Sequence, residues 1–164
     1  MSFDRQSRVI LFHATRDILQ VGEVVTADRE TLFYPDAVAA LDQARPTDAQ
    51  SRSTCLFAAE SPIACCEFMR AQGVGDFRIY KVKMPKFSNG PFCIIHQISA
   101  RIQDGRPYDA LISEYWTGDR DWNFLEYFGP QFSVLELILD RPSFIESASF
   151  RISYDADVKR VGRL

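Results

Sequence analysis

The 164-residue chain contains two histidines and four cysteines, the side chains best suited to acid–base or nucleophilic chemistry near neutral pH. His13 follows the apolar run Val9–Phe12, which has the character of a buried strand. A strand that delivers one histidine to its C-terminal end is a common way to build a ligand site. His13 is therefore the first candidate site residue, and its function depends on which residues partner it.

The cysteines give little support to a metal or thiol-based site. Cys55, Cys65, Cys66 and Cys93 form no C-x-x-C pair, so we expect buried free thiols in a reducing compartment. Cys93 and His96 could share a helix face, but two ligands make a weak metal site. The sequence also contains no Walker A, GxGxxG, HExxH, GxSxG or EF-hand motif.

Length and composition predict one globular domain over residues 1–164. Hydrophobic residues make up 46% and charged residues 25%, an ordinary globular balance. The net charge of -3 argues against a general nucleic-acid binder. No apolar run approaches the roughly 20 residues that cross a bilayer, and residues 1–6 have no apolar signal core. We expect a cytoplasmic protein without membrane contact. Delivery as an effector by a route that needs no signal peptide would not be visible in the sequence.

The chain mixes strand and helix patterns without regular alternation, which favours an α+β fold with a largely antiparallel or split sheet. Polar loops are expected at 47–53 and 117–123, and a frayed basic tail at 159–164. Strands are predicted over residues 8–13, 23–26, 54–59, 76–84, 124–128, 132–139 and 149–154; helices are predicted from Pro35 to near Pro46, from Ile63 to Gly73, from Pro91 to Gly105 and over 107–116.

Three short motifs occur in order along the chain. Leu11–Thr15 is followed by an Ile-Leu-x-x-Gly stretch, and Leu56–Pro62 leads from a strand that carries an aromatic residue into a helix. Leu125–Leu135 opens on a Glu-Tyr pair and hairpins through Gly129-Pro130 into a partner strand. In this order the chain resembles the ADP-ribosyltransferase fold, especially the branch with a His–Tyr–Glu triad that includes diphtheria-type toxins, poly-ADP-ribose polymerases and small bacterial enzymes. The resemblance implies split antiparallel β-sheets with flanking helices.

The resemblance also implies NAD as substrate and assigns a role to each matching residue. His13 would bond ribose hydroxyls, and Glu126 would bind the ribose 2′-hydroxyl and stabilise developing positive charge. The catalytic residues would therefore be Glu126 and His13. The implied NAD-binding residues are His13, Ala14, Thr15, Phe57, Ser61 and Tyr127, with Tyr115 and Trp116 as further stacking candidates.

Several alternatives stay open in the sequence. Phe57 stands where the family usually has tyrosine, so it keeps a stacking face and lacks the hydroxyl. Glu114, also in a Glu-Tyr pair, is the rival of Glu126. Three arginines are candidates for a pyrophosphate contact, although we expect each on the solvated surface: Arg8, Arg16 and Arg52.

The resulting functional expectation is transfer of ADP-ribose from NAD to an acceptor, with nicotinamide release. The acceptor is a protein, a nucleic acid or a small molecule, and the chain is a monomer or weak oligomer. One alternative is a catalytically impaired interaction module on the same fold, suggested by the missing hydroxyl. Another is an NAD-dependent RNA 2′-phosphotransferase-like enzyme, which the lack of clustered basic residues makes less favourable.

Overall fold

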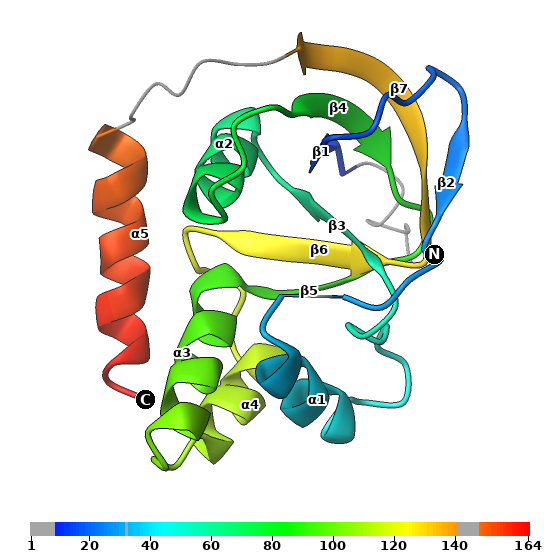
Figure 1. Ribbon diagram of the computed structural model, residues 1–164. Helices are drawn as coiled ribbons and strands as arrows, with labels where there is room; N and C mark the ends of the chain where they lie inside the picture. Colours follow the sequence, from blue (N-terminus) through cyan, green and yellow to red (C-terminus); the bar gives the residue numbers. More distant parts are fainter. Residues whose placement is uncertain (1–8, 32, 141–147) are drawn as a thin grey trace, which may run out of the picture.

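The computed structural model describes residues 9–31, 33–140 and 148–164 (Figure 1). Within these residues, five helices and seven strands form an α+β fold. In chain order they are β1 (Leu11–Thr15), β2 (Val24–Thr26), α1 (Pro35–Gln43), β3 (Leu56–Ala59), α2 (Pro62–Ala71), β4 (Arg78–Lys83), β5 (Ser88–Pro91), α3 (Phe92–Gln103), α4 (Asp109–Thr117), β6 (Leu125–Gly129), β7 (Gln131–Asp140) and α5 (Ala148–Val161). None of the described helices is long and apolar enough to cross a membrane.

The strands form one sheet in the order β2-β7-β4-β1-β3-β6-β5, and every neighbouring pair is antiparallel. The join between β1 and β3 rests on a single register pair, Phe12 with Ala59, whereas β1 and β4 share five. The sheet therefore consists of two parts. We call β2-β7-β4-β1 the first half-sheet and β3-β6-β5 the second half-sheet.

The predicted hairpin after Glu126 is wrong. β6 and β7 follow each other with only Pro130 between them, yet they do not pair. β6 pairs with β3 and β5 in the second half-sheet, whereas β7 pairs with β2 and β4 in the first. The chain thus crosses from one half-sheet to the other at this proline.

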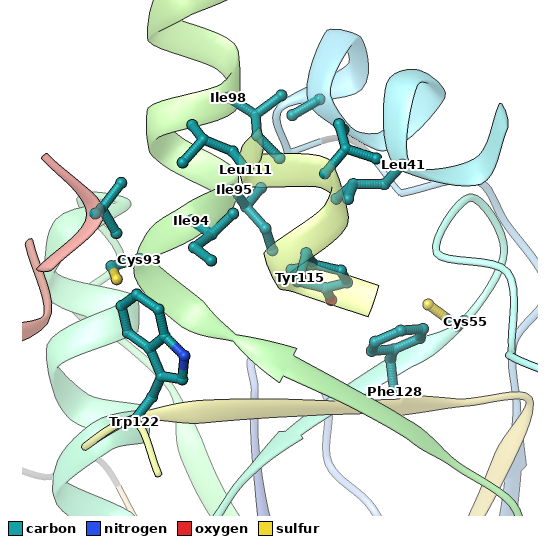
Figure 2. Close-up of a cluster of buried hydrophobic side chains, with 13 residues drawn as sticks. Leu41, Cys55, Cys93, Ile94, Ile95, Ile98, Leu111, Tyr115, Trp122 and Phe128 are labelled. Carbon is teal, nitrogen blue, oxygen red and sulfur yellow. The ribbon is translucent and has the colours of Figure 1, made fainter. Parts of the chain in front are cut away.

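Helices α1, α3 and α4 cover one face of the second half-sheet, and α5 lies along the flank of α3 (Figure 1). The apolar core between them includes Leu41, Ile98 and Tyr115 from the helices and Phe128 from β6 (Figure 2). A second core, with Leu11 and Phe132 among its members, lies on the other face, and a third packs α2 against Phe77 and Ile79. Both faces of the sheet are therefore partly buried.

The strand predicted over 54–59 and the helix predicted from Ile63 to Gly73 both form, and local signals around Ser61 explain the start of the helix. The Ser61 hydroxyl accepts a hydrogen bond from the Ala64 amide at 3.1 Å, and Pro62 occupies the first helical turn, where its missing amide costs nothing. Gly73 adopts φ of 71° just after α2, a conformation that favours glycine. Local signals are sufficient to define α2, because the Ser61 cap and Pro62 mark its start and Gly73 marks its end.

The C-terminal prediction is wrong. Residues 149–154 were expected to be a strand and 159–164 a frayed tail, but α5 runs from Ala148 to Val161. Tyr154, Val158 and Val161 recur at helical spacing and pack against the core beside α3, and Val161 is 1% exposed. Burial of this stripe stabilises the helix over the locally alternating pattern.

Candidate functional site

Glu126 lies on β6 within a buried cluster. Its carboxylate receives hydrogen bonds from Arg52 Nε at 2.9 Å to Oε1 and from Arg52 Nη2 at 3.1 Å to Oε2. The Tyr115 hydroxyl, from α4, donates to Oε1 at 2.5 Å. Tyr115, Arg52 and Glu126 are 0%, 4% and 7% exposed, so the three residues form a closed polar group inside the apolar core. We call this group the Glu126 cluster.

The electrostatics of the Glu126 cluster follow from burial and the ion pair. Burial raises the pKa of Glu126, and the Arg52 guanidinium and the Tyr115 hydroxyl oppose that rise. Burial acts to lower the pKa of Arg52, but the Glu126 charge, the Tyr115 hydroxyl and the hydrogen bonds to Glu126 together outweigh it, so the pKa of Arg52 is raised and the side chain stays cationic. Burial, followed by the Glu126 charge, raises the pKa of Tyr115, which stays protonated as a donor.

Arg52 reaches Glu126 from a loop that is tied firmly to α1. Asp42 accepts hydrogen bonds from the Arg52 amide at 2.9 Å, the Ser53 amide at 3.2 Å and the Ser51 hydroxyl at 2.6 Å. Partial burial acts to raise the pKa of Asp42, but these bonds outweigh it and lower that pKa. The expectation that Arg52 is solvated is therefore wrong, because the loop carries its side chain inward.

Aromatic rings surround the Arg52 guanidinium. Its Cζ lies 5.1 Å from the centre of the Phe57 ring, 5.6 Å from that of Phe128 and 5.8 Å from that of Tyr115. Arg52 Nη1 is buried and has no hydrogen-bond partner among the described residues. The Phe57 ring thus packs against an arginine, and this packing accounts for its position without a ligand.

His13 lies in the middle of β1, because the strand extends to Thr15 rather than ending at residue 13. Its Nδ1 lies 2.6 Å from the Phe57 carbonyl oxygen, and only a protonated Nδ1 can donate to that acceptor. Its ring lies 4.8 Å from the Phe132 ring. Burial lowers the pKa of His13, so the ring is neutral near pH 7 and Nε2 carries a lone pair.

The structure does not bring His13 and Glu126 together. Directly paired strand residues share a face: Glu126 pairs with Ala59, and Ala59 with Phe12. Successive residues alternate, so His13 points to the face opposite Phe12 and Glu126. The ring contacts agree, because Phe132 belongs to the core that contains Leu11, whereas Glu126 bonds Tyr115 in the helical core.

The remaining predicted binding residues lie in ordinary structural contacts. Ala14 packs near the α2 core, and the Thr15 hydroxyl accepts a hydrogen bond from the Asp17 amide at 3.0 Å. Ser61 caps α2. Tyr127 lies on the His13 face, in the same core as Phe132. Of the predicted set, Tyr127 belongs to that core and His13 contacts it through the Phe132 ring.

Glu60 is a carboxylate that the sequence reasoning missed. The Tyr127 hydroxyl donates a hydrogen bond to its Oε1. Burial, together with this bond to Glu60, raises the pKa of Tyr127. Strand alternation provides a signal, because Glu60 follows Ala58 by two residues and Ala58 pairs with Tyr127. A carboxylate therefore stands on the same face of the sheet as His13.

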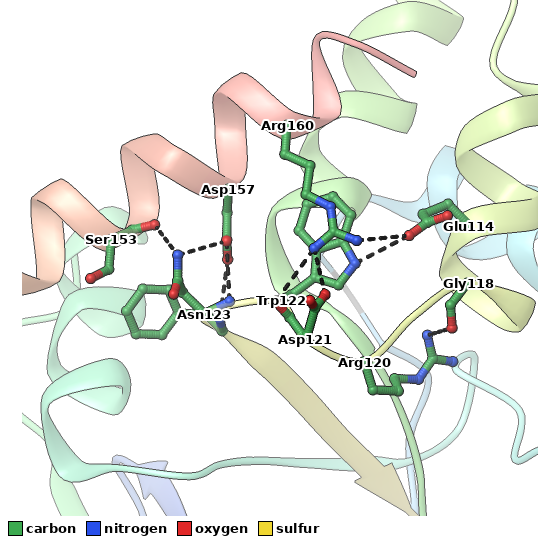
Figure 3. A network of polar contacts seen from close by, with 10 residues as sticks. Glu114, Gly118, Arg120, Asp121, Trp122, Asn123, Ser153, Asp157 and Arg160 are labelled. Carbon is green, nitrogen blue, oxygen red and sulfur yellow. Dashed lines mark hydrogen bonds and ion pairs between the residues drawn. The ribbon is translucent and has the colours of Figure 1, made fainter.

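The rival candidates are engaged elsewhere or stand apart. Glu114 accepts a hydrogen bond from Trp122 Nε1 at 3.2 Å and pairs with Arg160 Nη2 at 3.6 Å (Figure 3). These contacts join α4, which carries Glu114, to α5 and to the loop before β6. Arg16 is exposed, and Arg8 lies outside the described residues.

The four cysteines are free in the structure, and Cys55, Cys65 and Cys93 are buried. Burial raises the pKa of each of these three thiols to about 12, which keeps them protonated and unreactive. No group of three or more potential metal ligands occurs among the described residues. A comparison with protein-family models and with curated proteins gave no match to this chain.

Proposed function

We propose that this protein binds an NAD-type dinucleotide where the two half-sheets meet and serves as a binding module of the ADP-ribosyltransferase type. The observation that carries the proposal is the state of His13 at this junction. Its Nδ1 is held by the Phe57 carbonyl across the gap between β1 and β3. Nε2 has no hydrogen-bond partner in the described part of the chain, and it can accept a bond from a ribose hydroxyl.

The geometry of the junction supports a ligand between the half-sheets. β1 and β3 pair only at Phe12 and Ala59, so the backbone ladder between the half-sheets is limited to that pair. His13 directly follows the paired residue, and its ring lies between β1 and the Phe57 carbonyl. A fixed, neutral imidazole loses little freedom when a sugar hydroxyl binds, which favours recognition.

The position of Glu126 argues for binding rather than for transfer by this carboxylate. Its two oxygens are engaged by Arg52 and Tyr115 on the opposite face from His13. Breaking a buried ion pair costs about 3–5 kcal/mol. We therefore assign Glu126 a structural role and not that of the carboxylate that binds the ribose.

A second candidate is ADP-ribose transfer with Glu60 in place of Glu126. The observation that favours it is the Tyr127–Glu60 hydrogen bond on the His13 face. Glu60 is exposed, and a carboxylate at this position would stabilise positive charge that develops on a ribose as nicotinamide leaves. In this candidate the acceptor is a protein, a nucleic acid or a small molecule.

Calorimetric titration with NAD⁺ tests the binding proposal. Wild-type protein should bind, and His13→Ala should weaken binding about tenfold, the typical loss of one hydrogen bond. The matched control is His96→Ala, which changes the other histidine, exposed on α3. Absence of binding by the wild type, or equal affinity of His13→Ala and the wild type, would overturn the proposal.

Nicotinamide release separates the two candidates. If the protein only binds, NAD⁺ stays intact with every acceptor tested. If it transfers ADP-ribose through Glu60, release should occur in the wild type and disappear in Glu60→Gln. Glu136→Gln, a change at an exposed glutamate of β7, provides the control.

A further inference from the structure

A pocket of about 280 Å³ lies at the far edge of the second half-sheet, where β5, the end of α4 and the turn after α1 meet. Its lining includes Asp48, Phe87, Ser88, Asn89, Trp116 and Arg120. β3 and β6 separate β5 from β1 in the sheet, so this pocket is distinct from the His13 junction. We call it the β5 pocket.

Two aromatic side chains of the β5 pocket are held in place before any ligand arrives. The Trp116 indole donates from Nε1 to the Leu41 carbonyl at 2.9 Å, and its ring meets that of Tyr115 edge-on at 5.0 Å. The Phe87 ring stands edge-on to that of Tyr127 at 5.4 Å. A ligand that contacts these rings therefore does not need to order them.

The polar groups of the β5 pocket keep free hydrogen-bonding capacity. In the described part of the chain, the Asn89 side-chain amide and the Asp48 carboxylate make no hydrogen bond. The Ser88 hydroxyl accepts a bond from the Gln50 amide at 2.8 Å and retains its proton as a donor. Strand pairing places the Ser88 hydroxyl on the same face as Trp116, and the Asn89 amide on the opposite face with Phe87. The β5 pocket therefore extends around the free edge of β5 and offers a ring and a polar group on each side of that edge.

Arg120 adds a fixed positive charge. Its Nη2 donates to the Tyr115 and Trp116 carbonyls at 2.9 and 3.2 Å. Its Nη1 donates to the Gly118 carbonyl at 3.3 Å, the bond drawn in Figure 3. These contacts hold the guanidinium at the C-terminal end of α4. Three bonds leave two of its five N–H donors for a ligand.

We propose that the β5 pocket binds the purine base of a nucleoside. Aromatic side chains are the usual surfaces for bases, whose flat rings stack on them. An asparagine amide matches the N6 and N7 edge of adenine, and a guanidinium matches O6 and N7 of guanine. The pocket lies just below the roughly 300–1,000 Å³ of typical small-molecule sites, so it suits one nucleoside rather than a dinucleotide.

Titration of the isotope-labelled full chain, followed by NMR, tests the proposal. Adenosine and guanosine should shift the Trp116 indole and Asn89 side-chain signals more than uridine or cytidine does. The Trp122 indole, buried against Arg160 on the α5 side, is an internal reference that should not move. Absence of a Trp116 shift, or an equal shift of Trp122, would overturn the proposal.

Two variants test the assigned residues. Asn89→Ala should weaken purine binding about tenfold, the loss expected for one hydrogen bond. Asp48→Ala, on an exposed turn, leaves the sheet untouched and should weaken binding a few-fold. Gln43→Ala, an exposed change at the end of α1, is the control. Unchanged affinity in both Asn89→Ala and Asp48→Ala would overturn the assignment.

Two further titrations distinguish a base that belongs to a nucleic acid from a base that belongs to a free nucleoside. A short single-stranded purine oligonucleotide that binds more tightly than its nucleoside identifies RNA or DNA as the ligand, and weaker binding identifies a free nucleoside. Either result supports a base site. His13→Ala should leave purine binding unchanged, so failure of the NAD proposal and failure of this one are distinguishable.

Discussion

Replacing Arg52 by methionine should destabilise the fold through the carboxylate that it leaves behind. The guanidinium and Glu126 approach to 2.8 Å, and their side chains are 5% and 9% exposed. At an effective dielectric constant near 20, the attraction over this distance is about 6 kcal/mol. Much of that attraction offsets the cost of removing both charges from water, so the pair contributes far less than this value.

The single variant differs from the double variant for this reason. Arg52→Met leaves the buried Glu126 with the Tyr115 hydroxyl alone, and we expect the free energy of unfolding to fall by about 3–5 kcal/mol. The double variant Arg52→Met/Glu126→Leu buries no charge. It should recover most of that loss, because well-packed apolar side chains often replace a buried ion pair without cost.

Urea unfolding at pH 7 of the wild type, both single variants and the double variant provides the full thermodynamic cycle. The pH dependence gives a second measure. Burial raises the pKa of Glu126, and loss of Arg52 raises it further. The deficit of Arg52→Met should therefore shrink as pH falls towards that raised pKa, where the carboxyl becomes neutral. A loss below 1 kcal/mol, or a double variant that loses the sum of both single variants, would refute the reasoning.

Three further predictions concern other parts of the fold. Asp157→Ala removes three hydrogen bonds to the residues just before β6. It should reduce the free energy of unfolding by about 2–3 kcal/mol, measured by urea unfolding, and speed amide exchange in α5, measured by hydrogen exchange. Gly90→Ala would place a methyl group into the Tyr115 ring and should cost about 1–3 kcal/mol in thermal unfolding, whereas Gly75→Ala, with open space around it, should be neutral. Burial lowers the pKa of His13 in the folded protein, so protonation of this ring favours the unfolded chain. Unfolding titrations should show the wild type losing stability relative to His13→Gln as pH falls below about 6.5. Equal pH profiles of the two proteins would contradict this prediction.

Local signals predicted the parts of the fold whose residues agree among themselves. The cap at Ser61, the proline after it and Gly73 bound α2 without help from distant residues. Apolar and polar residues alternate over 149–154, a pattern that predicts a strand. The segment is helical because Tyr154 and Val161 pack against α3. A single sequence cannot decide between the strand period and the helix period here, because the covering surface is distant in the chain: Tyr154 meets Phe92 of α3, 62 residues earlier.

The candidate site was harder to predict because its contacts join distant segments. Arg52 and Glu126 are 74 residues apart, and nothing near either residue indicates its partner. The two faces on which His13 and Glu126 lie depend on strand order and on one register pair, Phe12 with Ala59. A shift of one residue in that register would exchange the faces. Motif order along the chain carries no information on this point.

The single-pair join between the half-sheets has a consequence for how the molecule opens. Few backbone hydrogen bonds can hold β1 to β3, whereas β4 and β7 are paired along six register positions. An opening that parts the half-sheets breaks few backbone pairs, but it also disrupts the core that Leu11 and Tyr127 share and the packing of α2 on both β1 and β3. The chain crossing at Pro130 tethers the two parts when the junction parts. The two half-sheets are therefore joined mainly by side-chain packing rather than by backbone pairing.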